Sequence, residues 1–338
     1  MPESLPPLVF EPRFVPKLWG GRRLETVLGK RLPEGVAIGE SWEVFDFPPG
    51  FVEGQEGWLS AKVAGGELKG KTLHELVVEK QESLLGSRVP IPTEDGPQFP
   101  LLIKFLDATE DLSIQVHPTL AYTLEHGEAH LKTECWIILA AEKDAFLYKS
   151  LKAGVTRDSF EAGLVAGTVA ELIGTTPAKK GDCHFLPSGA VHALGAGTLV
   201  AEVQTPSDTT FRVFDFNRVE AATGKVRKLH VKEALACINF QDTTTPPVTS
   251  MRNTDRPLVE CEYFKTTTVK AGAHSVRALP SGPMKIWMVT EGGVKFRWNG
   301  GGQMVVRAGQ TVVLPAFVVG GLMAGFGLNT TYLETVVP

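Results

Sequence analysis

Two distant segments of the chain share a pattern, and this internal repeat constrains the fold more than any other feature. Residues 181–194 read GDCHFLPSGAVHAL, and residues 309–322 read GQTVVLPAFVVGGL. Aligning the two places glycine on glycine and Pro187 on Pro315, with five residues between glycine and proline in both copies. The chain is therefore expected to hold two related structural units.

The first copy also carries a histidine that the second copy lacks. Its spacing is Gly, five residues, Pro, one residue, Gly, two residues, His192, which resembles the second sequence motif of cupins. The alignment sets Gly320 opposite His192, and the later glycine is missing too. We predict two cupin-like jelly-roll barrels, the first with a working site and the second without metal ligands.

Short apolar runs rich in Val, Ile, Phe and Thr dominate the sequence, as in residues 44–47, 199–204 and 285–290. They are separated by turn-forming residues, because the chain contains 35 glycines and 23 prolines. This pattern is typical of many antiparallel strands. The predicted fold class is mainly β, with a few short helices.

Three segments have the features of helices. Residues 71–85 place apolar side chains at helical spacing, Asp158 and Glu161 resemble a capping box, and residues 229–238 form a third candidate. The Thr-, Pro- and Asn-rich stretch 241–257 suits a linker. We therefore expect a catalytic cupin domain with a metal site over 1–245 and a cupin-like barrel without metal ligands over 246–338.

Composition and charge limit the classes of protein to which this chain can belong. The chain has 338 residues, of which 43% are hydrophobic, and its formal net charge of −4 predicts no general affinity for nucleic acid or membrane surfaces. Neither a signal-peptide pattern nor an apolar run of transmembrane length is evident, and the four cysteines are scattered. We expect a cytoplasmic protein with reduced thiols, as a monomer or weak homo-oligomer.

The run LSIQVHP places polar and apolar residues on opposite faces of a strand. Side chains alternate along a strand, so Ser113, Gln115 and His117 point one way and the three apolar residues point the other. If the apolar face packs against the wall of the barrel, the polar face lines either solvent or the barrel interior.

A second polar face occurs in KTECWIIL, where Lys132, Glu134 and Trp136 share one side of a strand. A barrel would bring Glu134 together with the polar face of LSIQVHP and with His192. Two imidazoles and a carboxylate make a plausible divalent metal site. Amides bind zinc poorly, so this argument alone leaves the part of Gln115 open.

Longer motifs resemble one enzyme family. The segments WGGRRL, GESWEV, FPLLIKFLDATEDLSIQVHP, KTECW and LPSGAVHALGAGTLVAEVQTPSDTTFRVFDFNR are similar to those of the short bacterial type I mannose-6-phosphate isomerases. The resemblance implies one zinc ion per chain and a phosphorylated hexose as substrate. It implies the zinc ligands Gln115, His117, Glu134 and His192. It also implies that Lys104, Ser113, Lys132 and Arg212 surround the sugar phosphate and that Trp19 borders the pocket.

Aldose–ketose isomerisation moves a proton between C1 and C2 through an enediolate. It needs a base, a Lewis acid and a phosphate handle. Lys132 is the candidate base, because a neighbouring cation would favour its neutral form. Arg212 could stabilise the enediolate or bind phosphate, and Lys104 and Ser113 are further phosphate candidates. Asp208 is interpreted as structural support.

Each candidate also has a structural interpretation. Lys104 could be a surface lysine, and Arg212 could pair with Asp208 or Asp215. His184 could face the barrel interior. Two histidines and one carboxylate in a cupin also describe non-haem iron oxygenases, and a cupin can bind a sugar without turning it over. Metal identification tests the first of these two alternatives, and a turnover assay tests the second.

Overall fold

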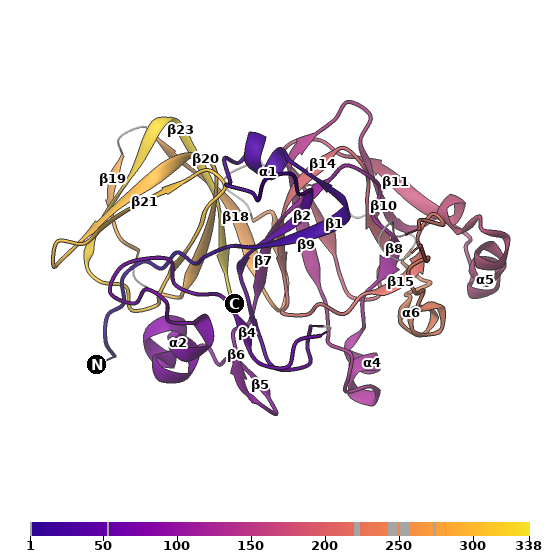
Figure 1. Ribbon diagram of the computed structural model, residues 1–338, viewed down its shortest axis with the longest axis horizontal. Coiled ribbons are helices and arrows are strands. Elements are labelled where there is room, and N and C mark those ends of the chain that lie inside the picture. The colour runs from indigo at the N-terminus through magenta and orange to yellow at the C-terminus, as the bar shows by residue number, and fades with distance from the viewer. Residues whose placement is uncertain are drawn as a thin grey trace.

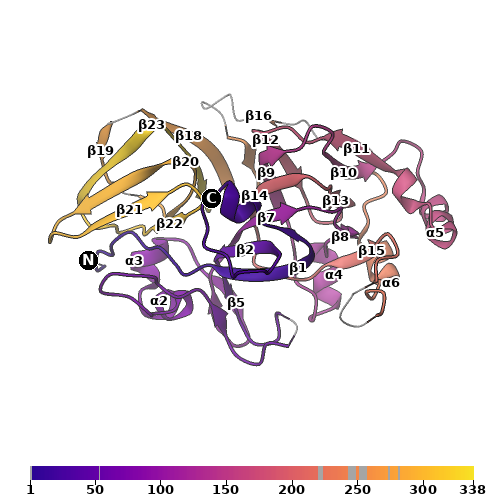
Figure 2. The same cartoon turned by 45° about the horizontal axis from the view of Figure 1, so that its top comes forward.

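The computed structural model describes residues 2–52, 54–219, 224–242, 249–250, 257–272, 275–280 and 282–338. Most of the predicted linker 241–257 lies outside these residues. Strands dominate the described chain and the helices are short, so the predicted mainly β class is confirmed. Figures 1 and 2 show two β units side by side, with the orange-to-yellow C-terminal unit at one end.

The larger unit is built from two facing sheets. In spatial order, the first sheet contains β1 (Arg13–Gly21), β2 (Ile38–Val44), β7 (Leu102–Ala108), β14 (Thr198–Gln204), β9 (Glu134–Ala141), β12 (Asp182–Leu186) and β16 (Thr249–Ser250). The second contains β11 (Ile173–Pro177), β10 (Phe146–Leu151), β13 (His192–Leu194), β8 (Ile114–Val116) and β15 (Phe211–Phe214). Apolar side chains between the two sheets, Trp136, Leu147, Leu194 and Val200 among them, fill much of the interior.

The C-terminal unit is one strongly curved sheet. Its order is β17 (Val259–Glu260), β18 (Lys265–Gly272), β23 (Gly321–Val336), β20 (Lys285–Trp298) and β21 (Gln303–Arg307). β19 (Val276–Ala278) pairs with β23, and β22 (Thr311–Leu314) pairs with β20. Small hairpins join β3 (Asp46–Phe47) to β4 (Leu59–Ser60) and β5 (Ile91–Thr93) to β6 (Gly96–Gln98).

The two copies of the repeat fold alike. β12 ends at Leu186, directly before Pro187, and β22 ends at Leu314, directly before Pro315. His192 then opens β13, and Gly320 immediately precedes β23. In both units, therefore, the aligned proline directly follows the end of a strand.

One hydrophobic core spans both units. It includes Ile137 and Val203 from the first sheet with Met288 and Leu333 from the C-terminal sheet. The segment before β1 also joins the C-terminal unit, since Leu8 exchanges two backbone hydrogen bonds of 2.8 Å with Val313. The division at residue 245 stays a prediction.

The helices lie at the edges of these sheets. They are α1 (Arg23–Thr26), α2 (Leu73–Glu79), α3 (Gln81–Leu85), α4 (Leu120–Glu125), α5 (Arg157–Ala166), a 3-10 turn (Val169–Leu172) and α6 (Val231–Cys237). In both cartoons α5 and α6 lie at the end opposite the C-terminal unit. Among the described residues, we find no helix with the length and apolar character needed to cross a membrane.

Two helix expectations need correction. The predicted helix 71–85 is broken at Lys80, whose backbone (φ −131°, ψ 29°) leaves the helical region. The capping box before α5 is formed by Thr156 and Ser159 rather than by Asp158 and Glu161. Thr156 has the extended backbone that a cap requires, whereas Asp158 already lies in the first helical turn.

Candidate metal centre and active-site cavity

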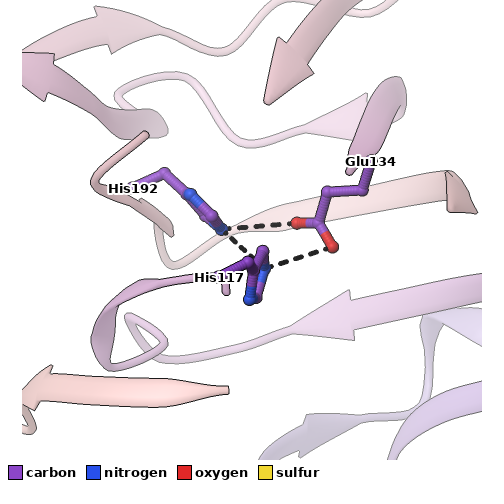
Figure 3. A group of neighbouring side chains, drawn as sticks. All are labelled: His117, Glu134 and His192. Atoms are coloured by element: carbon purple, nitrogen blue, oxygen red, sulfur yellow. Dashed lines mark hydrogen bonds and ion pairs between the residues drawn. The ribbon is translucent and has the colours of Figure 1, made fainter. Parts of the chain in front are cut away.

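Three buried side chains meet inside the larger unit (Figure 3). His117 follows β8, Glu134 opens β9 and His192 opens β13, so two facing sheets supply them. Nε2 of His192 lies 3.2 Å from Nε2 of His117 and 3.4 Å from Oε1 of Glu134. Nε2 of His117 lies 3.4 Å from Oε2 of Glu134. All three side chains are fully buried.

Gln115 lies beside this group. It is the register partner of His192 across β8 and β13, and its Nε2 is 3.4 Å from Nε2 of His192. A half-turn of the amide would present its oxygen at the same place. The structure thus brings together all four residues that the family resemblance of the motifs implied as zinc ligands.

The spacing of the donor atoms fits a tetrahedral metal ion. Ligands at about 2.0 to 2.1 Å from a tetrahedral ion are about 3.3 Å from one another. The observed separations of 3.2 to 3.4 Å match that edge length. Oε1 of Glu134 makes no hydrogen bond to the described residues, and Oε2 faces the ammonium of Lys132, so Oε1 is the oxygen left to serve a metal cation.

The protonation states also suit metal binding. Burial and the charge of Lys132 lower the pKa of His117 to about 3, so its imidazole is neutral at physiological pH. Burial raises the pKa of Glu134, but Lys132 and His117 together lower it well below its usual range. The Nδ1 hydrogen of His192 is donated to the carbonyl of Ala190 at 2.9 Å, which leaves the Nε2 lone pair for a metal.

A cavity of about 500 Å³ opens beside these ligands. Its wall includes all the other residues proposed from the sequence, namely Trp19, Lys104, Ser113, Lys132 and Arg212, together with Gln115 and Trp136. The two polar strand faces therefore line one space, as the alternation of side chains predicts.

Two of the three lysines in the cavity wall, Lys104 and Lys132, are buried and ion-paired. Nζ of Lys132 lies 3.0 Å from Oε2 of Glu134. Nζ of Lys104 lies 3.5 Å from a carboxylate oxygen of Glu40 and 3.5 Å from one of Glu202. Burial lowers the pKa of Lys104, but these carboxylates raise it above its ordinary value, so the ammonium stays charged. Lys104 is thus part of the site rather than of the surface.

Sequence reasoning missed several residues of the cavity wall. Glu40, Glu202, Arg227 and His230 line it, and so does Asp208, which was interpreted as structural support. The sequence did indicate Glu202, because it is the lone acidic residue in β14, whose seven residues are all buried. An acidic residue is seldom fully buried without a partner. His184 is fully buried as well, but it does not belong to the cavity wall.

The fold and this site define a β-barrel protein with a candidate metal centre beside a polar cavity. A family model described as the catalytic domain of type I phosphomannose isomerase matches residues 10–146. A probable mannose-6-phosphate isomerase of Bacillus subtilis is 35% identical over 92% of this chain and 93% of its own length. A mannose-6-phosphate isomerase of Streptococcus mutans is 31% identical over 91% of this chain and 92% of its own.

A solved structure agrees with these sequence relatives. The crystal structure of the mannose 6-phosphate isomerase from Bacillus subtilis superposes with a TM-score of 0.78 at 28% identity. The match covers 98% of this chain and 99% of that one. The chain belongs to the type I phosphomannose isomerase family.

Proposed function

We propose that this protein is a metal-dependent aldose–ketose isomerase that interconverts mannose 6-phosphate and fructose 6-phosphate through an enediolate. The observation that carries the proposal is the position of Lys132. Its amine lies in the cavity wall and contacts the carboxylate of the candidate metal centre. A base and a Lewis-acid site thus border the same space, as proton transfer next to a carbonyl requires.

We propose zinc as the metal, one ion per chain, held by Gln115, His117, Glu134 and His192. Two imidazoles with a single carboxylate form a donor set typical of zinc. A bound divalent cation would supply Lewis acidity toward the carbonyl and hydroxyl oxygens of the substrate. We place the centre in a catalytic domain over 1–245 and expect none in residues 246–338.

The chain's own residues account for the remaining steps. Lys132 takes the proton from one of the two reacting carbons and returns it to the other. Arg212, the register partner of Gln115 on β15, lies where its charge stabilises the enediolate. Trp19, Lys104 and Ser113 complete the wall that holds the sugar. Trp136 donates a hydrogen bond of 2.8 Å to Glu202, which fixes the indole beside His192.

Metal analysis followed by a turnover assay tests the proposal. The purified protein should contain about one zinc per chain, convert each of the two hexose phosphates into the other, and exchange the C2 hydrogen with deuterated water. Binding of the sugars without turnover or exchange would favour a non-catalytic sugar-binding cupin. Iron as the functional metal, with consumption of dioxygen, would favour an oxygenase.

A further inference from the structure

A second cavity lies next to the one that contains the candidate active site. It has a volume of about 860 Å³ and is bordered by the β5–β6 hairpin, by the segment that follows α4, and by Pro206 and Tyr263. Among the described residues, only Gly50 and Phe51 border both cavities. The two cavities are therefore separate but adjacent, and the side chain of Phe51 stands between them.

A tight turn holds the backbone of Phe51 in place. Residues 48–51 read Pro-Pro-Gly-Phe, and the backbone N–H of Phe51 donates to the carbonyl of Pro48 at 3.3 Å. Gly50 has a φ of 79°, as the third position of a type II turn requires, and proline is favoured at the second position. The local sequence therefore fixes where Phe51 lies.

The ring of Phe51 is stacked on the imidazole of His130. The ring centroids are 3.5 Å apart, and the planes are inclined by 18°. The backbone N–H of His130 donates to Oγ1 of Thr209 at 3.2 Å, and Oγ of Ser207 donates to the carbonyl of His130 at 2.9 Å. Thr209 borders the first cavity and His130 the second. The stack thus joins two distant segments of the chain into one partition between the cavities.

The second cavity suits a neutral group that is rich in hydroxyls. Its wall contains the carboxylates of Glu94, Asp95 and Glu128 and the amide of Gln98, and the described residues of this wall include no lysine or arginine. Burial lowers the pKa of His130, so its ring is neutral at physiological pH. Carboxylates and amides form hydrogen bonds with sugar hydroxyls, whereas the carboxylates repel a phosphate. This cavity is therefore matched to an uncharged sugar.

We propose that Phe51 is a specificity-determining residue, whose ring closes the substrate cavity toward the second cavity and restricts the enzyme to the phosphate of a single hexose. The reaction uses C1 and C2 of mannose 6-phosphate, and C6 carries the phosphate. In the pyranose form, O3 and O4 are then the hydroxyls to which a further sugar can be attached. Without the ring of Phe51, the second cavity would receive that sugar. This inference rests on the proposed function.

The test compares Phe51→Ala with Tyr263→Ala. Both variants remove an aromatic ring from the second cavity, but Tyr263 does not border the first cavity, so its loss does not join the two. Each metal-loaded protein is assayed with mannose 6-phosphate and with its 3-O-mannosyl and 4-O-mannosyl derivatives. The measured quantity is the kcat/KM for each derivative divided by that for mannose 6-phosphate. In Phe51→Ala this ratio should rise at least about 10-fold for one of the derivatives, and in Tyr263→Ala it should stay at the wild-type value.

Phe51→Tyr and a crystal structure complete the comparison. Tyrosine keeps the ring, so Phe51→Tyr should keep the wild-type ratios, and the structure of Phe51→Ala should show one continuous cavity. Unchanged ratios in Phe51→Ala would refute the proposed role. The same holds if the wild type already accepts a derivative as well as it accepts mannose 6-phosphate, or if Tyr263→Ala raises the ratio as much as Phe51→Ala does.

Calorimetry separates this inference from the proposed function. A wild type that binds mannose 6-phosphate without turning it over would refute the isomerase proposal, and the Kd values of the same three sugars would then decide the role of Phe51. Wild-type turnover of mannose 6-phosphate with unchanged ratios in Phe51→Ala would leave the isomerase proposal standing and refute this inference. If the wild type binds none of the three sugars, both are wrong.

Discussion

Nζ of Lys132 lies 3.0 Å from Oε2 of Glu134, and both side chains point to the same face of the chain at the start of β9. The carboxylate that we assign to the metal therefore also contacts the amine that we assign to proton transfer. Changes at one residue should act on the other, and the two roles can be separated only by variants that remove one group at a time.

Lys132→Met keeps the aliphatic stem of the side chain and removes the amine. We expect a folded protein that retains its metal and binds the hexose phosphate somewhat more weakly. Turnover should fall at least about 100-fold, the lower end of what a positioned base contributes. Exchange of the C2 hydrogen with deuterated water should fall in parallel, because deprotonation is the affected step.

The matched control for this variant is Lys152→Met, which changes an exposed lysine outside the cavity wall. It should leave turnover and exchange unchanged. Near wild-type exchange in Lys132→Met would mean that another group is the base.

His117→Ala and His192→Ala should each abolish metal binding and activity together. Each removes an imidazole from a donor set whose atoms lie within 4.8 Å of one another, and the remaining groups no longer form a closed site. Elemental analysis of the purified variants measures the metal directly. His126→Ala, at a half-exposed histidine beside Glu128, should keep both metal and activity. Full metal content in His117→Ala or in His192→Ala would exclude the proposed ligands.

Leu8→Ala tests the contact between the N-terminal segment and the C-terminal unit. Leu8 is 1% exposed, and its removal leaves a cavity in the core that both units share. We expect the free energy of unfolding to fall by about 2 to 5 kcal/mol, as for other buried leucines. Urea denaturation measures the loss. Val165→Ala, at a side chain that is 92% exposed, should change it by less than about 0.5 kcal/mol.

Lys149→Met should make the free energy of unfolding less dependent on pH in the alkaline range. Nζ of Lys149 is buried without a hydrogen-bond partner among the described residues, and burial lowers the pKa of this lysine to about 8 from 10.5. Between these values the unfolded chain binds more protons, so wild-type stability should rise with pH. Below pH 8 the variant should be more stable by up to about 3 kcal/mol.

The pH dependence of the stability difference tests whether the buried charge of Lys149 is its cause. The difference between Lys149→Met and the wild type should shrink as the pH rises from about 8 toward 10.5, because Lys149 is then neutral in the folded protein and progressively loses its proton in the unfolded chain. Unfolding curves taken at several pH values measure it. A constant difference across the range would show that burial of the charge is not its cause.

Local rules predicted much of this molecule from its sequence. The alternation of side chains along a strand predicted one polar face with Ser113 and Gln115 and another with Lys132, and all three residues line the cavity wall. That rule succeeds because the two-residue period depends only on the extended backbone. The glycine–proline spacing of the repeat likewise predicted two related units, and in each unit a strand ends directly before the proline.

The residues that were missed depend on the order of strands, which no local pattern encodes. Glu40 and Glu202 reach the same lysine because β2 and β14 both flank β7 in the first sheet. His230 and Arg227 come to the cavity through the turn of the chain between β15 and α6. Strand order results from the packing of the whole barrel, so these neighbours could not be read from the sequence.

The pairing of Leu8 with Val313 affects how the chain folds during its synthesis. Most of the described chain separates these two residues, and Val313 lies in β22. The N-terminal segment therefore remains without its final partner until the ribosome has made β22. Such distant contacts slow folding and leave apolar surface exposed to chaperones in the meantime. A nascent chain stalled before β22 should accordingly be held by chaperones, whereas the released chain should not.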